Sequence, residues 1–324
     1  MVKAAVLEEF GKPFKIADVD LKPLSSDWVE VEVKAVGICG RDVVVWRGGF
    51  RSLRPPLILG HEVFGLYEGR PVAVYPAIVT DKNCLKYMEG RENLCEGYLI
   101  LGESVPGGYA EKVYVPQWNL IELSEASFEK YAAAACGVAT FIHAARKAGI
   151  SGGSKVLVTG ASGGVAVHGI QFLVSMGVEV YAATRSEEKA RLLEKLGATP
   201  VIAQKGFGAE LARSHGRVDA VFEVAGAPTI NESLRALKPG GTLVLIGNVE
   251  GQPIVLERPA LTVMREHHIV GSAAYTKREY ASAIRIIEKG LIKPFYKTYK
   301  LNEVNKAYED IVAGRLVGRA ILKP

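Results

Sequence analysis

The chain has 324 residues, of which 48% are hydrophobic and 23% charged, and its formal net charge is +5. This length and composition predict a globular protein of two domains and exclude a chain that is mainly disordered. No run of five or six like charges occurs, and the uncharged stretch 131–145 is shorter than the about 20 apolar residues of a membrane span. We therefore expect a cytoplasmic protein with neither a nucleic-acid partner nor a membrane anchor, since the N-terminus also lacks the apolar core of a signal peptide.

The first 120 residues have the pattern of short strands. Polar and apolar residues alternate in segments 2–6 and 28–33, and the apolar runs 57–59 and 72–75 lie beside glycine or proline. This pattern predicts an irregular, β-rich first domain.

From about residue 124 strands and helices alternate. The sequence predicts a helix over 127–148, a strand over 155–159, a helix over 165–176, a strand over 178–183 and a helix over 187–196 that Ser186 caps. Further strands are expected at 198–202, 219–223 and 242–246, followed by a helix at 277–289 and a last short segment at 319–322. Strands without polar interruptions, separated by helices, indicate an α/β domain with a parallel sheet covered on both faces.

Glycines mark a candidate nucleotide site. The chain has 35 glycines, more than the usual share of about 7%, and Gly160, Gly163 and Gly164 lie where the strand 155–159 turns into a helix. A phosphate site needs glycine there, because a Cβ would block the approach of the pyrophosphate to the helix N-terminus. Strand–helix turns also contain glycine for steric reasons alone, but the strand before and the helix after favour phosphate binding.

The end of the second strand distinguishes NADP(H) from NAD(H). An NAD site has an acid there for the ribose hydroxyls, whereas this chain has Thr184 and Arg185, with no acid before Glu187. An arginine among small hydroxyl residues suits a 2′-phosphate, so we expect NADP(H). The alternative is that Arg185 is an ordinary solvated residue ahead of a helix.

Five segments together carry a family resemblance: 37–42 (GICGRD), 60–62 (GHE), 107–111 (GGYAE), 158–164 (VTGASGG) and 237–247 (LKPGGTLVLIG). With them the chain resembles the medium-chain dehydrogenase/reductase superfamily, the zinc alcohol dehydrogenases and their relatives, over its whole length. Arg41, the Thr184–Arg185 region and residues 226–228 look most like archaeal members that are alcohol dehydrogenases or acryloyl-CoA reductases. The resemblance implies a GroES-like catalytic domain over 1–123 and 272–324 and a Rossmann domain over 124–271.

The resemblance implies a catalytic zinc held by Cys39, His61 and Cys136, with Glu62 in the inner shell. Two cysteines, a histidine and an open position are what a catalytic zinc requires. For Cys136 alone the alternative is a packed thiol on an alanine-rich helix. Without an export signal, the four cysteines of the chain fit metal ligands or thiols better than a disulfide framework.

Arg41 departs from the family pattern, which has Ser or Thr two residues after the first cysteine and a relay histidine where this chain has Val44. A guanidinium cannot act as a general base, but it can stabilise a developing oxyanion. One hypothesis is that Arg41 partly or wholly replaces zinc as the electrophile. The other is that it points away and pairs with Asp42, which belongs to the same predicted catalytic set.

The family's structural zinc lobe is incomplete in this sequence. Its four positions fall on Asp81, Cys84, Tyr87 and Cys95, and Tyr87 is a poor zinc ligand. We expect a bound zinc completed by a neighbouring acid or a water; the alternative is a degenerate lobe with two leftover thiols.

The resemblance implies a hydride transfer between NADP(H) and an alcohol or ketone, with an enoyl (acryloyl-CoA-like) or quinone reductase as the alternative enzyme and an NADPH-binding redox sensor as the non-enzyme alternative. By the same analogy we expect a homodimer or homotetramer, with residues 254–272 at the subunit interface. The cofactor is expected to contact Thr140, Gly160, Ser162, Gly163, Gly164, Val165, Thr184, Arg185, Lys189, Val224, Gly226, Ile246, Gly247, Ser272 and Ala273.

Overall fold

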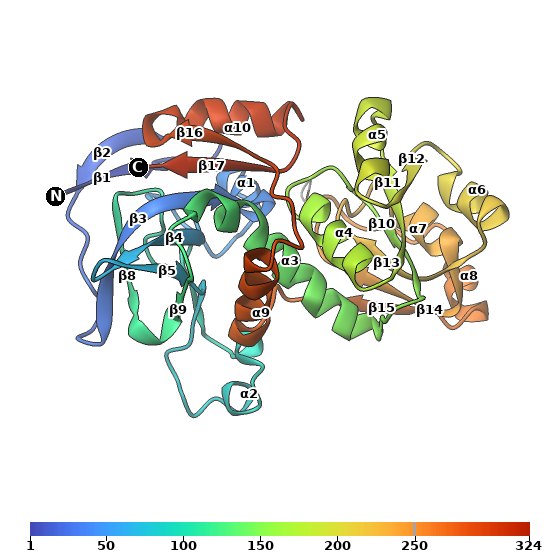
Figure 1. Ribbon diagram of the computed structural model, residues 1–324, viewed down its shortest axis with the longest axis horizontal. Coiled ribbons are helices and arrows are strands. Elements are labelled where there is room, and N and C mark those ends of the chain that lie inside the picture. Colours follow the sequence, from blue (N-terminus) through green and yellow to red (C-terminus); the bar gives the residue numbers. More distant parts are fainter. Residues whose placement is uncertain (249–250) are drawn as a thin grey trace. The chain divides into compact units, whose positions relative to one another are not determined.

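The computed structural model describes residues 1–248 and 251–324. The chain forms two compact units, one of residues 1–136, 276–290 and 294–324 and the other of residues 137–275 and 291–293. Both ends of the chain belong to the first unit, as the blue and red ribbons show (Figure 1). The chain passes from the first unit to the second after residue 136 and returns to the first after residue 275. The predicted domain limits lie at 123 and 271.

The first unit is built on a seven-stranded sheet with the order β16–β17–β3–β4–β5–β9, in which β8 also pairs with β3. Two small two-stranded sheets, β1–β2 and β6–β7, complete its strands. The strands are β1 (Val2–Val6), β2 (Lys15–Val19), β3 (Trp28–Ile38), β4 (Glu62–Tyr67), β5 (Arg70–Val74), β6 (Ala77–Ile78), β7 (Leu99–Ile100), β8 (Lys112–Pro116), β9 (Leu120–Glu122), β16 (Tyr296–Lys300) and β17 (Arg319–Lys323).

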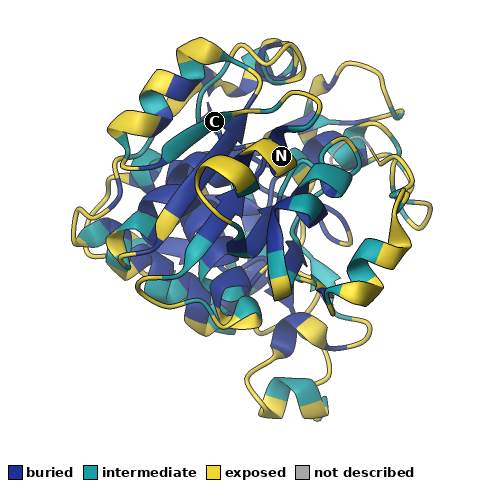
Figure 2. Ribbon diagram, turned by 90° about the vertical axis from the view of Figure 1, so that its right-hand side faces the viewer, coloured by how far each residue is buried: buried dark blue, intermediate teal, exposed yellow. Residues whose placement is uncertain are grey.

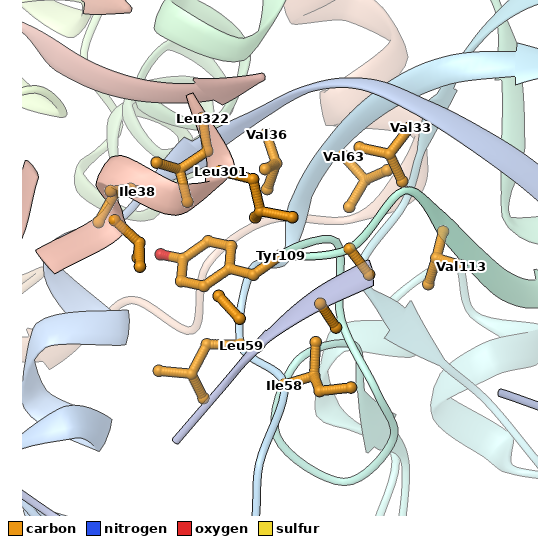
Figure 3. Close-up of a cluster of buried hydrophobic side chains, with 14 of the residues drawn as sticks. Val33, Val36, Ile38, Ile58, Leu59, Val63, Tyr109, Val113, Leu301 and Leu322 are labelled. Atoms are coloured by element: carbon orange, nitrogen blue, oxygen red, sulfur yellow. The ribbon is translucent and has the colours of Figure 1, made fainter. Parts of the chain in front are cut away.

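Alternating burial on β3 produces the core of this unit. Val31 and Val33 are buried, whereas Glu30 and Glu32, which alternate with them, are exposed, as the period of two of a strand requires. The ring of Tyr109 lies among aliphatic side chains from several strands (Figure 3). Burial of such side chains contributes about 1.5–3 kcal/mol each, and this core holds the ends of β3 and β4 together.

The helices of the first unit are short, and their capping is visible in the sequence. Thr276 caps α9, because its hydroxyl accepts from Glu279 N while the Glu279 carboxylate accepts from Thr276 N, a reciprocal capping box. The helical segments are α1 (Gly40–Trp46), α2 (Leu85–Met88), α9 (Lys277–Glu288), α10 (Val304–Val312) and the 3-10 turns η1 (Glu92–Leu94), η2 (Gln117–Asn119) and η3 (Leu301–Glu303).

The second unit contains the predicted parallel sheet, so the α/β fold class is confirmed. Its six strands have the order β12–β11–β10–β13–β14–β15, and every neighbouring pair is parallel. The strands are β10 (Lys155–Val158), β11 (Glu179–Thr184), β12 (Thr199–Ile202), β13 (Val218–Glu223), β14 (Leu237–Leu245) and β15 (His268–Gly271). The chain reverses its direction of travel through the sheet between β10 and β13, and open α/β sheets bind ligands at the carboxyl ends of such strands.

Helices cover both faces of this sheet. Leu157 and Val221 pack with residues of α6 and α7 on one face, whereas Phe222 contacts Phe141 of α3 on the other, with 5.3 Å between ring centroids. Figure 1 shows α4 and α6 on opposite sides of the sheet, and Figure 2 shows the buried strands in dark blue with the yellow, exposed surfaces of the helices outside them. The helices are α3 (Phe128–Ala148), α4 (Ala166–Ser175), α5 (Glu187–Lys195), α6 (Phe207–Ser214), α7 (Ile230–Ala236) and α8 (Pro259–Met264).

Among the described residues, none of the helices combines the length and the hydropathy that crossing a membrane requires.

Candidate active site

Four potential metal ligands form one buried cluster in the first unit. Ligand atoms of Cys39, His61, Glu62 and Cys136 all lie within 4.8 Å of one another. Cys39 follows the end of β3 and Glu62 begins β4, and the antiparallel register places Gly37 opposite Glu62. Gly37 permits the close approach, because a Cβ there would lie 2.1 Å from Glu62 Oε2 and 2.6 Å from the carbonyl oxygen of Ala132 on α3. The structure therefore brings together all four residues of the predicted catalytic metal site.

Asp42 orients two of these ligands. It is 1% exposed, and its carboxylate accepts hydrogen bonds from Cys39 N at 2.8 Å and from the Tyr109 hydroxyl at 3.2 Å. The other oxygen, Oδ1, lies 3.0 Å from His61 Nδ1. In the tautomer whose Nδ1–H donates to Asp42, the Nε2 lone pair of His61 is left for a metal, which is the usual outer-shell arrangement of a metal-binding histidine.

Burial and mutual charge shift the protonation of the cluster. A hydrogen bond from Cys136 lowers the pKa of Cys39 well below its usual value, and the same bond raises the pKa of Cys136. Burial would lower the pKa of His61, but the negative charges of Asp42 and Cys39 raise it well above its ordinary value. Burial also raises the pKa of Glu62 to about 8. Without a metal the buried cluster therefore retains protons, which a bound cation would displace.

The ligand set fits zinc. Thiolate, imidazole and carboxylate are zinc ligands, and Cys39, His61 and Cys136 supply the three protein ligands of a catalytic zinc, whose fourth position is left for Glu62 or a substrate oxygen. Neither carboxylate oxygen of Glu62 accepts a hydrogen bond of good geometry from the described residues, although Glu62 is 1% exposed. A buried carboxylate of this kind is costly unless a cation lies beside it, as Arg319 does at 3.0 Å and as a bound metal would.

Arg319 provides a second charge beside the cluster, and the sequence analysis did not predict it. Arg319 Nη2 lies 3.0 Å from Glu62 Oε1, both side chains are almost completely buried, and Nη1 donates to the carbonyl oxygen of Ile38 at 3.4 Å. Burial disfavours its charged form, but Glu62 and Cys39 raise the pKa of Arg319 above its usual value. The available signal was a lone arginine at the start of an otherwise apolar terminal strand.

Arg41 pairs with Glu103 rather than with Asp42, so the hypothesis of an Arg41–Asp42 ion pair is wrong. Its Nη2 donates to Glu103 Oε2 at 2.9 Å and its Nε donates to the other oxygen of the same carboxylate. The guanidinium also lies over the ring of Phe50, 4.6 Å from its centroid. Asp42 is unavailable to Arg41 because Cys39, Tyr109 and His61 surround its carboxylate. Glu103 is a further residue that the sequence analysis missed.

The lobe predicted to hold a structural zinc contains a disulfide instead. Cys84 and Cys95 are joined by a disulfide, which uses both thiols that a zinc ion would need as thiolates. Asp81 is exposed and accepts from Asn83 N at 2.9 Å. The expectation of zinc at Asp81, Cys84 and Cys95 is therefore corrected to a disulfide that closes the loop carrying α2, which projects below the sheet in Figure 1.

Reduction of this disulfide is expected to lower the free energy of unfolding by about 3 kcal/mol, because the bond restricts a short loop in the unfolded chain. Thermal or urea unfolding with and without a thiol reductant measures the change. The Cys84→Ser/Cys95→Ser variant should unfold like the reduced protein and be insensitive to reductant. Destabilisation by a chelator alone, with no effect of the reductant, would instead show that the lobe holds a metal.

The predicted cofactor residues of the second unit gather at the carboxyl ends of its strands. Gly160 follows β10 with φ +60°, and Gly226 follows β13 with φ +86°. A Cβ on Gly226 would lie 2.6 Å from Asn248 Oδ1, and one on Gly247 would lie 2.6 Å from the carbonyl oxygen of Val224. These close approaches require glycine. Ile246 also lies at this edge, at the end of β14, whereas Ser162, Gly163, Gly164 and Val165 form the turn before α4, and Ser272 and Ala273 follow β15.

The remaining predicted cofactor residues lie on α3 and beyond β11. Thr140 is buried on α3, and Thr184 is the last, buried residue of β11. Arg185 is exposed and Ser186 caps α5 by accepting from Lys189 N at 3.3 Å. No carboxylate occurs at 184–186.

Comparison with known proteins identifies the family of the chain. Residues 25–125 match the family model of the alcohol dehydrogenase GroES-like domain, and residues 164–289 match that of the zinc-binding dehydrogenases. The chain is 32% identical over 337 residues to an acryloyl-coenzyme A reductase of Sulfurisphaera tokodaii, with both chains covered completely. The chain belongs to the zinc-containing alcohol dehydrogenase family. This membership confirms the resemblance drawn from the motifs and the GroES-like and Rossmann architecture.

Two other members of this family extend the comparison. An NAD-dependent alcohol dehydrogenase of Saccharolobus solfataricus is 30% identical, with all of both chains covered. The structure of a cobalt- and zinc-bound thermostable alcohol dehydrogenase from Pyrobaculum aerophilum superimposes with a TM-score of 0.89 at 28% identity, covering 100% of this chain and 99% of that one. The likeness therefore extends over the whole chain.

Proposed function

We propose that this protein is an NADP(H)-dependent oxidoreductase that transfers a hydride between the nicotinamide and an alcohol or ketone substrate. The observation that carries the proposal is the buried cluster of Cys39, His61, Glu62 and Cys136, in which four ligand atoms lie within 4.8 Å. Structural needs do not explain a group of two thiols, an imidazole and a carboxylate at this depth.

Cys39, His61 and Cys136 would hold the zinc, with Glu62 as an inner-shell carboxylate. When bound there, zinc supplies a Lewis acid that polarises a carbonyl or stabilises an alkoxide. Asp42 fixes the orientation of His61, while Arg319 balances the charge of Glu62. Arg41 is already paired with Glu103, and this neutralisation favours zinc over Arg41 as the electrophile.

The turn 160–165 would receive the pyrophosphate, and the strand ends at Val224, Gly226, Ile246 and Gly247 would receive the nicotinamide half. When bound, NADP(H) supplies the hydride, whereas the protein supplies orientation and electrostatics. The relative from Saccharolobus solfataricus is NAD-dependent. In this chain the exposed Arg185 and the absence of an acid at 184–186 favour NADP(H).

Arg185→Ala is expected to raise the Kd of NADP(H) by about 10- to 100-fold, because it removes a charge-assisted hydrogen bond to the phosphate. The Kd of NAD(H) should stay within a factor of three. Quenching of protein fluorescence on titration with each dinucleotide measures both values. Arg191→Ala, which removes an exposed arginine from α5, is the matched control. An equal change for both dinucleotides in Arg185→Ala would contradict NADP(H) selectivity through this residue.

A second candidate function is the reduction of a double bond conjugated to a thioester carbonyl. It is favoured by the relative from Sulfurisphaera tokodaii, an acryloyl-coenzyme A reductase, and by the replacement of the expected hydroxyl residue with Arg41. Hydride transfer from NADPH to a panel of ketones, quinones and enoyl-CoA esters separates the candidates. Tight NADPH binding without turnover of any of them would support the redox-sensor alternative instead.

We also propose that the protein is a homodimer or homotetramer through the edge of the second unit's sheet. β15 is an edge strand, and nearby apolar side chains are exposed, namely Val255, Val263, Met264 and Ile269. An apolar surface beside an unpaired strand edge is typical of a subunit interface. Light scattering during size-exclusion chromatography measures the mass of the particle, which should be two or four times that of one chain.

A further inference from the structure

Glu223, the last residue of β13, is a completely buried carboxylate at the proposed cofactor edge. Its Oε1 accepts hydrogen bonds from Gly226 N at 2.9 Å, from the Thr229 hydroxyl at 2.6 Å and from the Thr159 hydroxyl, and its Oε2 accepts from the Ser233 hydroxyl at 2.5 Å. None of the described lysine, arginine or histidine side chains forms an ion pair with it. Buried carboxylates without a cation persist only where several donors are fixed around them.

The donors come from separate segments that meet at this one side chain. Thr159 follows β10, Gly226 lies in the loop after β13, and Ser233 belongs to α7. The Thr159 hydroxyl also accepts from Val224 N at 3.0 Å and from Ala225 N at 3.2 Å, so its own hydrogen is committed to Glu223.

The backbone of Glu223 fixes the neighbouring strand as well. Its carbonyl oxygen accepts from Ile246 N at 2.9 Å and from Gly247 N at 3.1 Å. One residue thus links the ends of β10, β13 and β14. The residues proposed to contact the nicotinamide half follow β13 and β14.

We infer that Glu223 is a positioning residue that holds the loop 224–226, directly and through the Thr159 hydroxyl, in the conformation that receives the nicotinamide half of the cofactor. The inference rests on the proposed function and adds a residue that does not itself touch the cofactor. The loop has little freedom to adapt, because Gly226 has φ +86° and Asn248 lies against it. A carboxylate is required because every partner is a donor, and an amide would turn its own N–H groups toward one of them.

The test compares two ligands that share the adenosine half. NADP(H) has both halves, whereas adenosine 2′,5′-bisphosphate lacks the nicotinamide. In Glu223→Gln we expect the Kd of NADP(H) to rise about 10- to 100-fold, with the Kd of adenosine 2′,5′-bisphosphate within a factor of three. Both are measured by titration calorimetry on folded protein. If Glu223 were needed only for stability, Glu223→Gln would lower the unfolding temperature and leave the ratio of the two Kd values unchanged. That result would overturn the inference.

A milder pair of variants decides the question if Glu223→Gln does not fold. Thr229→Val removes one donor to Glu223 and should weaken NADP(H) selectively, whereas Thr229→Ser keeps the hydroxyl and should restore binding. Ser214→Ala, which removes a hydroxyl bonded only within α6, is the control for loss of a hydroxyl in the same unit. Equal NADP(H) affinity in Thr229→Val and Thr229→Ser would overturn the inference, and a wild-type protein that binds neither ligand would overturn the proposed function instead.

Discussion

Cys39→Ala is expected to abolish metal binding at the buried cluster and to lower turnover by more than about a hundredfold. Cys39 contributes a thiolate at the junction of β3 and α1, where Asp42 accepts from its backbone N at 2.8 Å. Alanine removes the thiolate and leaves the helix cap in place, so the loss is confined to the ligand. Metal analysis of the purified variant and steady-state kinetics measure the two effects.

Cys84→Ala is the matched control, because it also removes one cysteine of the same unit. Cys84 is joined to Cys95 outside the cluster, so this variant should keep the metal and its turnover while losing stability. If Cys84→Ala lost the metal and Cys39→Ala kept it, the zinc would lie in the α2 lobe. That result would contradict the proposal that the buried cluster holds the catalytic metal.

Arg41→Ser distinguishes the two electrophiles that the sequence left open. If zinc is the electrophile, this variant keeps the metal and most of its turnover, because Arg41 is already neutralised by Glu103. If Arg41 is the electrophile, the turnover of Arg41→Ser falls as far as that of Cys39→Ala, although Arg41→Ser retains the metal.

Local sequence patterns predicted the elements that are determined locally. The cap at Ser186 and the acids at 187–188 predicted α5, and the apolar run 156–158 predicted β10. By contrast, α6 and α7 were not predicted: each has fewer than nine residues, and α6 begins after Gly206 in a left-handed conformation without a capping side chain. Short helices of this kind form because Phe207 and Ile230 pack against the sheet, which is a tertiary effect.

The site shows the same difference between features that local sequence determines and features that depend on the tertiary fold. Family motifs identified Cys39, His61, Glu62 and Cys136, but not their partners. Arg319 lies 257 positions after Glu62 in the chain and meets it only because β17 pairs with β3. The Cys84–Cys95 disulfide also required the structure: the sequence favoured metal ligands or free thiols over disulfides, and this prediction is wrong for Cys84 and Cys95.

Arg319→Met is expected to lower the free energy of unfolding of the metal-free protein by about 3 kcal/mol at pH 10, because Glu62 of the wild type is ionised there, whereas the variant must take up a proton or bury that charge without its cation. Methionine keeps much of the volume of the side chain, so the loss reports charge more than packing. Burial raises the pKa of Glu62 to about 8 even with Arg319 present, and removing the cation raises it further. Urea unfolding in the presence of a chelator, at pH 5 and at pH 10, measures the change.

The pH dependence identifies the cause. An acid whose pKa is raised in the folded state holds a proton that the unfolded chain has already released, so stability falls as pH rises from the unfolded pKa of about 4.5 to about 8. Arg319→Met should therefore be destabilised less at pH 5, where Glu62 is protonated and neutral in both proteins, than at pH 10, where Glu62 of the wild type is ionised. Adding Glu62→Gln should recover most of the loss and remove the difference between the two pH values, whereas an equal loss at both would show that Arg319 acts through packing and not through the charge of Glu62.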